Sequence, residues 1–338
     1  MAKLFESLDI GKMKIKNRIV MPPMCVYSAD EDGVAKDFHL VHYGARALGG
    51  VGFIIMEATG VSNAGRITNN CLGLWNEEQA DAIKRIVDMG KSAGCKMGIQ
   101  LQHAGRKCEV SSVDEIFAPS AISFGGKYRT PKEMTKSHIT QLVEDFGNSA
   151  KLAEKAGFDA IEVHGAHGYL ISTFLSPLSN KREDEYGGTP ENMARIARQV
   201  LASVRANFSG TVGIRVSAED YAPGGNSPED MANLINFFKD ELDFIDVSSG
   251  GVVDMEKRAF FPGYQTTYAE IIKKAVDIPI ITGGLLHEPE HMEAILSNDR
   301  ADMVFVGRRL LADPAFPLFA AKKMGVDVKW PKQYTAGK

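Results

Sequence analysis

Short runs of apolar, largely β-branched residues recur along the chain, and polar or small residues follow each of them. Eight such runs lie at residues 17–24, 51–58, 96–103, 158–165, 211–218, 243–250, 278–284 and 301–308. Nearly continuous apolar runs of this length are typical of strands buried on both faces of a parallel sheet. The pattern therefore predicts eight parallel strands.

Helical periodicity occupies several of the segments between these runs. Apolar residues recur at helical spacing in two sets, at Ile139, Leu142, Val143, Phe146, Ala150 and Ala153 and at Phe38, Val41, His42, Ala45 and Leu48. Two further helices are predicted to begin at Thr189-Pro190-Glu191 and Ser227-Pro228-Glu229, where an N-cap hydroxyl precedes proline and an acid.

A strand followed by a helix, eight times over, predicts an α/β fold, a single (β/α)8 TIM barrel spanning residues 1–338. Residues 104–136 are rich in Ser, Gly and Lys, and we interpret them as a capping insertion after the third strand. Residues 326–338 are expected to form an extended C-terminal tail.

Composition narrows the class of protein. The net charge is −4 without a long Lys/Arg block, which argues against a nucleic-acid partner. No apolar stretch reaches 18 residues, so no membrane association is expected. The four cysteines, Cys25, Cys71, Cys95 and Cys108, contain no C-x-x-C pair. That argues against a zinc or iron–sulfur site and suits reduced thiols in a cytoplasmic protein.

The candidate chemistry lies at the carboxyl ends of the strands, where TIM barrels place their catalytic groups. The segment HGAHGYL after the fourth strand brings together His164, His167 and Tyr169. The histidines could be metal ligands, satisfied loop residues, or N–H donors to a ligand oxygen. Their spacing does not match a helical metal-binding pair, and Tyr169 favours the interpretation in which an acid lies across from two donors.

Two other groups of residues suggest an anionic ligand. Gly283-Gly284 and Gly307-Arg308 end the seventh and eighth strands, the usual phosphate position of the barrel, although ordinary tight turns would explain them too. Arg215 lies inside an apolar run and needs a negative partner, which could be Glu162 or a ligand. Cys25 also ends a strand, where an inert thiol is commoner than a nucleophile.

Taken together, these segments resemble the Old Yellow Enzyme family of FMN-dependent ene-reductases from about Leu4 to Tyr334. The motifs that carry the resemblance are KNRIVMPPMCVYS (16–28), GIQLQHAGRK (98–107), HGAHGYLISTFLSPLSNKREDEYGG (164–188), RVSAEDY (215–221), VSSGG (247–251) and FVGRRLLADP (305–314). Cys25 and His167 make the chain similar to the bacterial subclass of the Bacillus yellow enzymes.

The resemblance implies a role for each matching residue. The flavin would be bound by Pro22, Pro23, Met24, Cys25, Ala58, Gln100, His164, Arg215 and Gly251, and its ribityl phosphate would be held by Gly283, Gly284, Gly307 and Arg308. Tyr27, His164 and His167 would bind the substrate oxygen, Tyr169 would donate a proton and Cys25 would tune the flavin. No metal is implied.

The resemblance also implies NADPH as hydride donor and activated alkenes as substrates: α,β-unsaturated aldehydes, ketones, imides and nitroalkenes. Members of this subclass are often homodimers or homotetramers with a C-terminal arginine after a QY pair. Here Thr335 and Ala336 follow Gln333-Tyr334, so that arginine is missing. Two alternatives stay open: a phosphate-ligand isomerase or lyase without flavin, and a non-catalytic flavin-binding protein.

Overall fold

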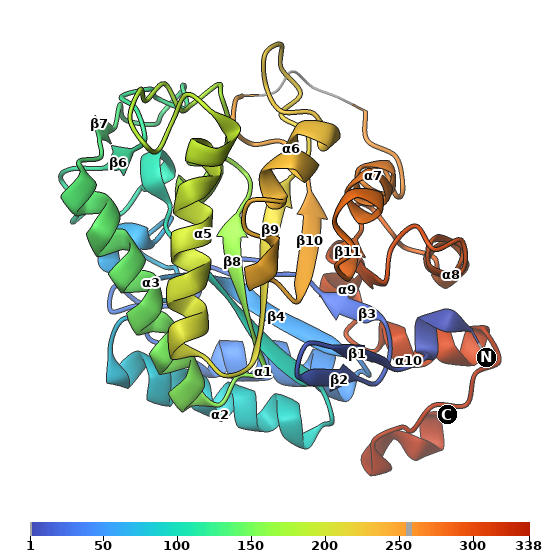
Figure 1. The fold of residues 1–338 in the computed structure, drawn as a ribbon. Coiled ribbons are helices and arrows are strands. Elements are labelled where there is room, and N and C mark those ends of the chain that lie inside the picture. Colours follow the sequence, from blue (N-terminus) through green and yellow to red (C-terminus); the bar gives the residue numbers. More distant parts are fainter. Residues whose placement is uncertain (1, 255–258) are drawn as a thin grey trace.

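A closed barrel of eight parallel strands forms the centre of the molecule (Figure 1). The computed structural model describes residues 2–254 and 259–338. In order around the barrel the strands are β3 (Ile19–Met21), β4 (Phe53–Gly60), β5 (Lys96–Gln102), β8 (Ala160–Gly165), β9 (Thr211–Ser217), β10 (Phe244–Ser248), β11 (Ile280–Thr282) and β12 (Met303–Phe305). Seven of them lie within the predicted apolar runs, and β4 extends two residues beyond its run at 51–58, so the predicted (β/α)8 barrel is confirmed.

Helices surround the barrel (Figure 1). They are α1 (Asp37–Leu48), α2 (Glu77–Ser92), α3 (Lys136–Ala156), α4 (Leu170–Leu175), α5 (Pro190–Asn207), α6 (Pro228–Ile235), α7 (Thr266–Val276), α8 (Pro289–Ser297), α9 (Arg308–Ala312) and α10 (Phe316–Lys323). The two predicted helix starts are confirmed, because the side chains of Thr189 and Ser227 accept hydrogen bonds from backbone N–H groups of the first turns of α5 and α6.

The predicted buried face agrees with the structure in α3 but only in part in α1. In α3, Ile139, Leu142, Phe146, Ala150 and Ala153 are buried, as predicted, and Val143 is partly buried against the same core. In α1 the predicted face is right at His42, which is buried, but wrong at Phe38 and Val41, whose side chains are 54% and 69% exposed. The other buried residues of this helix are His39, Tyr43, Gly44, Arg46 and Ala47. Hydropathy misplaced this face because α1 buries polar side chains that hydrogen-bond inside the protein.

An N-terminal hairpin closes the barrel at the amino ends of its strands. β1 (Leu8–Ile10) pairs antiparallel with β2 (Met13–Ile15), and the pattern of long apolar runs did not reveal these short strands. Ile10, Met13 and Ile15 pack with Phe53 and Phe244 in one buried cluster. Polar chemistry is therefore directed to the opposite end of the barrel, where the strands finish.

The segment 104–136 lies between β5 and α3. It contains the 3-10 turn η3 (Gly105–Lys107) and two short parallel strands, β6 (Phe117–Ala118) and β7 (Lys132–Glu133), near the carboxyl ends of the barrel strands (Figure 1). At the other end of the chain, the tail finishes in the 3-10 helix η5 (Lys332–Gly337). Trp330 is buried against Phe319 of α10, with ring centroids 5.6 Å apart, while Tyr334 is half exposed.

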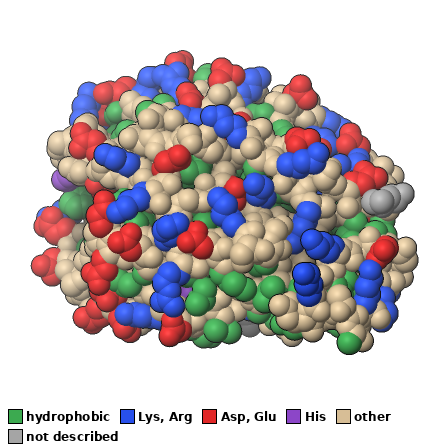
Figure 2. Space-filling view, turned by 90° about the horizontal axis from the view of Figure 1, so that it is seen from below, with side chains coloured by type: hydrophobic (Ala, Val, Ile, Leu, Met, Phe, Trp, Pro, Cys, Tyr) green, Lys and Arg blue, Asp and Glu red, His purple; other side chains and the backbone are tan. Residues whose placement is uncertain are grey.

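The remaining 3-10 turns are η1 (Lys3–Phe5), η2 (Asn63–Gly65) and η4 (Lys239–Glu241). On the face seen from below, acidic and basic side chains lie interspersed rather than segregated by sign (Figure 2). Among the residues that the structure describes, no helix combines the length and the apolar character needed to cross a membrane.

Candidate active site

Two cavities open at the carboxyl ends of the strands, and Arg215 of β9 lines both. The first, of about 210 Å³, is lined by Pro23, Cys25, Tyr27, Ala58, Ile67, Gln100, His164, His167, Tyr169 and Arg215. The second, of about 230 Å³, is lined by Arg215, Ser248, Phe260, Tyr264, Gln265, Gly284, Leu285, Leu286, His287, Phe305, Gly307 and Arg308. Most of the predicted site residues are thus gathered around one arginine.

The side chains of HGAHGYL face one another in the first cavity. The ring of His164 lies 5.3 Å from that of His167 and 5.0 Å from that of Tyr169, measured between centroids, and both contacts are edge-on. His164 ends β8, and Tyr169 is the residue that precedes α4. The predicted trio is therefore brought together by one strand end and the loop after it.

His167 is held by three different elements. Its backbone N–H donates to Ser217 Oγ of β9 at 2.9 Å, and its carbonyl accepts from Lys107 Nζ at 2.8 Å. Its ring Nε2 lies 2.7 Å from Ser248 Oγ of β10. The residue has a φ of +59°, a left-handed conformation that a histidine adopts rarely. These contacts fix a strained residue in place.

Burial keeps these groups uncharged. It lowers the pKa of His164 and His167 well below the usual range, so both imidazoles are neutral at physiological pH. It raises the pKa of the Tyr169 phenol, which therefore retains its proton. The site thus holds neutral imidazoles, each of which can offer one N–H, beside a protonated phenol.

Cys25 is half-buried on the cavity wall, and burial, together with the nearby Glu57, raises the pKa of its thiol. A thiol that stays protonated is a poor nucleophile, so the geometry favours the interpretation of Cys25 as a wall residue. Within the described residues, no group of three or more His, Cys, Asp or Glu side chains could hold a metal ion.

Arg215 has a partner that the sequence did not reveal. Its Nε lies 3.2 Å from Asp246 Oδ2 of β10, in a buried ion pair. Glu162, the internal partner considered from sequence, instead accepts a hydrogen bond from Gln100 Nε2 at 2.7 Å. Burial raises the pKa of Glu162 well above its usual value, and that of Asp246 to about 6. Near neutral pH Asp246 therefore carries the negative charge that faces Arg215.

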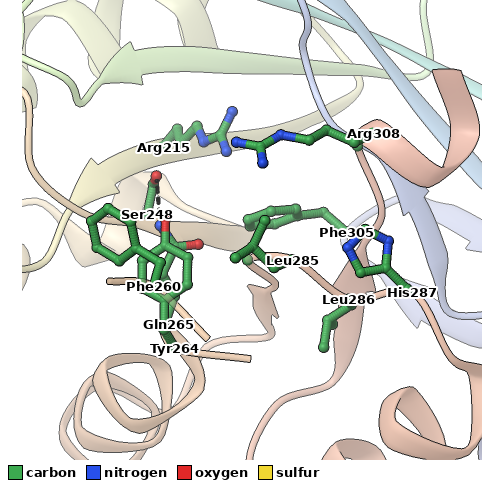
Figure 3. A pocket seen from close by; sticks show the side chains of 12 residues that line it. Arg215, Ser248, Phe260, Tyr264, Gln265, Leu285, Leu286, His287, Phe305 and Arg308 are labelled. Carbon is green, nitrogen blue, oxygen red and sulfur yellow. Dashed lines mark hydrogen bonds between the residues drawn. The ribbon is translucent and has the colours of Figure 1, made fainter. Parts of the chain in front are cut away.

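The second cavity holds two guanidinium groups. Figure 3 shows Arg215 and Arg308 pointing toward one another across the cavity, with the ring of Phe305 below them. Two cations that converge in this way need a negative partner, and Asp246 supplies one charge on the Arg215 side. Gly307 lines the second cavity, and a Cβ built on it would have Met24 Sδ 3.3 Å away and Pro22 Cγ 3.7 Å away, so the two residues pack beside this glycine.

These observations fit FMN. The two cavities meet at Arg215, so an elongated molecule could place a flat ring beside Cys25 and Ala58 and an anionic group beside Arg308. The predicted residues that line neither cavity lie close by: Pro22 and Met24 lie beside Gly307, Gly283 lies against the Phe305 ring, and Gly251 lies against His167. Sequence reasoning missed Ile67, Phe260, Tyr264, Gln265, Leu285, Leu286, His287 and Phe305 in the linings.

Lys107 is another residue that the sequence analysis did not single out, although it ends the motif GIQLQHAGRK. Its Nζ donates to the carbonyls of His167 and Gly251, at 2.8 and 2.6 Å, and lies 3.8 Å from the centroid of the Phe124 ring. Burial, followed by the charge of Arg106, lowers the pKa of Lys107 to about 7. The lysine joins the loops that follow β5, β8 and β10.

The strand ends of this parallel barrel gather two arginines, neutral histidines and a buried tyrosine. This site fits an enzyme of the flavin oxidoreductase class, whose cofactor carries a phosphate. Residues 3–326 match the model of the NADH:flavin oxidoreductase / NADH oxidase family. The chain belongs to this family, within the Old Yellow Enzyme group expected from the sequence. It is an FMN-dependent oxidoreductase.

Several relatives are similar over almost their whole length. An NADPH dehydrogenase of Clostridium acetobutylicum is 50% identical over 335 residues, covering 98% of both chains. One of Geobacillus sp. strain WCH70 is 48% identical, covering 99% of this chain and 98% of the relative. The shared name of these relatives agrees with the electron donor expected from the sequence.

Solved structures agree with the fold. Morphinone reductase superposes with a TM-score of 0.84 at 27% identity, covering 98% of this chain and 92% of that chain. An old yellow enzyme homologue from Zymomonas mobilis superposes with a TM-score of 0.79, also at 27% identity, covering 97% and 94%.

The contact between Gly168 and Gly251 yields a prediction about the frame of the site. Gly168 has a φ of +70°, and a Cβ there would clash with the carbonyl oxygen of Gly251. Gly94 has a φ of +69° with nothing within 4 Å of such a Cβ. We expect Gly94→Ala to cost about 1–2 kcal/mol from backbone strain alone, and Gly168→Ala to cost about 1–3 kcal/mol more from the clash. Urea unfolding of both variants measures the difference, and equal losses would contradict the clash.

Proposed function

We propose that the protein is an ene-reductase that uses NADPH to reduce the activated C=C bond of α,β-unsaturated aldehydes, ketones, imides and nitroalkenes. The observation that carries the proposal is the grouping of two neutral histidines and a protonated tyrosine in the cavity that Arg215 joins to a second, cationic one. Such a grouping suits a substrate that carries an oxygen at one end and needs a proton at the other.

FMN would be held along Pro22, Pro23, Met24, Cys25, Ala58, Gln100, Arg215 and Gly251, and its phosphate by Gly283, Gly284, Gly307 and Arg308. When bound, it supplies hydride transfer, from NADPH in one half-reaction and to the alkene in the other. A solved structure of morphinone reductase in complex with tetrahydroNAD, with a TM-score of 0.83 to this chain, supports a nicotinamide nucleotide as the hydride donor.

His164 and His167 would donate N–H groups to the substrate's carbonyl or nitro oxygen, with Tyr27 at the rim of the same cavity. These hydrogen bonds withdraw electrons from the alkene, so its β carbon accepts hydride more readily, and they strengthen as negative charge develops on the oxygen. Tyr169 would then donate its proton to the α carbon. Cys25 would contact the flavin as a neutral thiol and tune its redox potential.

Family membership favours this function over the two alternatives. An isomerase or lyase without flavin would leave the first cavity, with its histidines and Tyr169, without a task. A non-catalytic flavin-binding protein would not need a proton donor across from two N–H donors. A cytoplasmic location stays a prediction.

Replacing Tyr169 tests the proton donor. Tyr169→Phe should retain FMN and its reduction by NADPH but slow reoxidation by 2-cyclohexenone about 10²–10⁴-fold, because general acid catalysis is lost. Stopped-flow absorbance of the flavin follows both half-reactions. Tyr186→Phe is the matched control, since its hydroxyl bonds Gln199 at 3.2 Å outside the cavities. An unchanged reoxidation rate in Tyr169→Phe would exclude this role.

The histidines are tested by binding. A phenol mimics the oxygen end of the substrate, and either His164→Ala or His167→Ala should weaken its binding about tenfold through the loss of one hydrogen bond. The flavin absorbance change on titration with 4-hydroxybenzaldehyde measures this affinity. Treatment with EDTA should leave wild-type activity unchanged. Inactivation by EDTA that zinc reverses would favour the metal-ligand interpretation.

We further propose that the protein assembles as a homodimer or homotetramer through its tail, without the arginine of its relatives. Trp330 packs against Phe319, which remains 49% exposed, and Tyr334 is also half exposed, so an apolar surface is available beside the tail. A chain ending at Lys329 should shift to a smaller species in sedimentation velocity at micromolar concentration. A chain ending at Thr335, which keeps both aromatic residues, is the control. A wild-type monomer would contradict the proposal.

A further inference from the structure

Glu57 occupies a β-bulge directly beside the candidate active site. β4 pairs with β5 in regular register up to Met56 and again from Ala58, and the register shifts between them, at Glu57. A bulge re-aims the side chain at its extra residue, and bulges often lie next to active sites. Here the carboxyl group is 0% exposed and precedes Ala58, which lines the first cavity.

The carboxylate accepts hydrogen bonds at both oxygens. Oε2 accepts from the backbone N–H of Val26 at 3.1 Å, and Oε1 accepts from the Tyr43 hydroxyl at 3.1 Å. That hydroxyl in turn accepts from the backbone N–H of Glu57 at 3.0 Å. Tyr43 belongs to the buried face of α1 that hydropathy misassigned, and Glu57 explains why this position is polar.

His39 of α1 completes the surroundings. Its Nδ1 accepts from the backbone N–H of Lys36 at 3.0 Å, so the neutral ring carries its proton on Nε2. This nitrogen lies 3.6 Å from Glu57 Oε1. Burial lowers the pKa of His39, so the ring is neutral near pH 7.

The backbone that Glu57 holds carries two cavity residues. Val26 lies between Cys25 and Tyr27, and both line the first cavity. Tyr27 has a φ of +51°, a left-handed conformation that is strained for a tyrosine and persists only where its surroundings enforce it. The hydrogen bond from Val26 to a buried carboxylate is such a constraint.

Glu57 is also the group in this cluster whose charge changes near neutral pH. Burial raises its pKa from 4.5 to about 7, against the opposing effect of the hydrogen bonds from Val26 and Tyr43. The titratable groups facing it are His39 and Tyr43 from α1 and Cys25 and Tyr27 from the loop after β3. Burial keeps the cysteine and both tyrosines protonated, and Lys36 acts on His39 from the helix start.

We propose that Glu57 is a positioning residue, whose carboxylate form holds the Cys25–Tyr27 segment in the geometry that enone reduction requires. This inference rests on the proposed function. When Glu57 gains a proton, one oxygen becomes a donor, yet both oxygens face donors, Val26 N–H and Tyr43 O–H. One of these hydrogen bonds must then break or reorient, which loosens Tyr27 at the cavity rim.

The first experiment measures reoxidation of the NADPH-reduced holoenzyme by 2-cyclohexenone, which does not titrate, between pH 5.5 and 8.5. The wild-type rate constant should fall about tenfold below pH 7, the factor for one charge-assisted hydrogen bond. Glu57→Gln should be slow and independent of pH across this inflection. Tyr43→Phe should move the inflection to higher pH, because the Tyr43 hydrogen bond lowers the pKa of Glu57.

The second experiment follows thermal unfolding of the holoenzyme against pH and does not depend on turnover. Because the folded pKa of Glu57 is raised above its unfolded value of 4.5, its stabilising contribution is complete below pH 4.5 and is lost as the pH rises through about 7. Glu57→Gln should therefore lose less stability than the wild type between pH 5 and pH 8. Glu78→Gln, in the exposed first turn of α2, should follow the wild type.

The outcomes separate this inference from the proposed function. A wild-type holoenzyme that NADPH cannot reduce, or that enones cannot reoxidise, contradicts the proposed function, while the unfolding experiment still tests the titration of Glu57. An inflection that persists unchanged in both Glu57→Gln and Tyr43→Phe belongs to another group, such as Lys107, and overturns the inference. If Glu57→Gln does not fold, the direction of the shift in Tyr43→Phe decides.

Discussion

The rest of the site depends on the buried guanidinium of Arg215, which lies at the centre of the barrel mouth. Removing Arg215 from water is costly unless negative partners surround it. Asp246 on the neighbouring strand supplies one, and the hydrogen bond from Gln100 to Glu162 places a largely protonated acid beside that pair. Asp246 balances only one of two positive charges, because Arg308 adds a second cation from the far side of the cavity (Figure 3). The remaining positive charge favours a ligand that becomes negative. The fold is therefore arranged to bind an anion between Arg215 and Arg308.

The same burial decides the chemistry available on the other side of Arg215. Histidines in this position lose their positive charge, and the tyrosine keeps its proton, so the cavity offers hydrogen-bond donors without additional charge. Uncharged donors of this kind depend on being held in the right position relative to the substrate oxygen. His167 accordingly has its N–H, its carbonyl and its ring nitrogen each held by a residue from a different element of the barrel.

The sequence predicted the barrel and most of the site, because the strand ends carry both the hydrophobic pattern and the chemistry. It failed where a polar residue is buried for a partner distant in sequence. Tyr43 on the buried face of α1 is explained by its hydrogen bond to Glu57, which lies on another element. The partner of Arg215 follows from the pairing of β9 with β10. The N-terminal hairpin escaped because its strands have three residues each, too few for a periodic pattern. Neither strand pairing nor a bulge can be read from hydropathy.

Two groups whose pKa values are about 7 lie behind different residues of the first cavity, and both gain a proton as the pH falls. Lys107 gains a positive charge as the pH falls, under the loop of His167, whereas Glu57 loses its negative charge behind Tyr27. Acidification therefore makes the surroundings of the first cavity more positive on both sides. An anionic ligand such as a phenolate would gain electrostatic attraction in the same pH range in which the Tyr27 segment loosens. An uncharged enone does not gain that attraction when it binds, so comparing its pH dependence with that of a phenolate separates the positioning effect from the attraction of an anion.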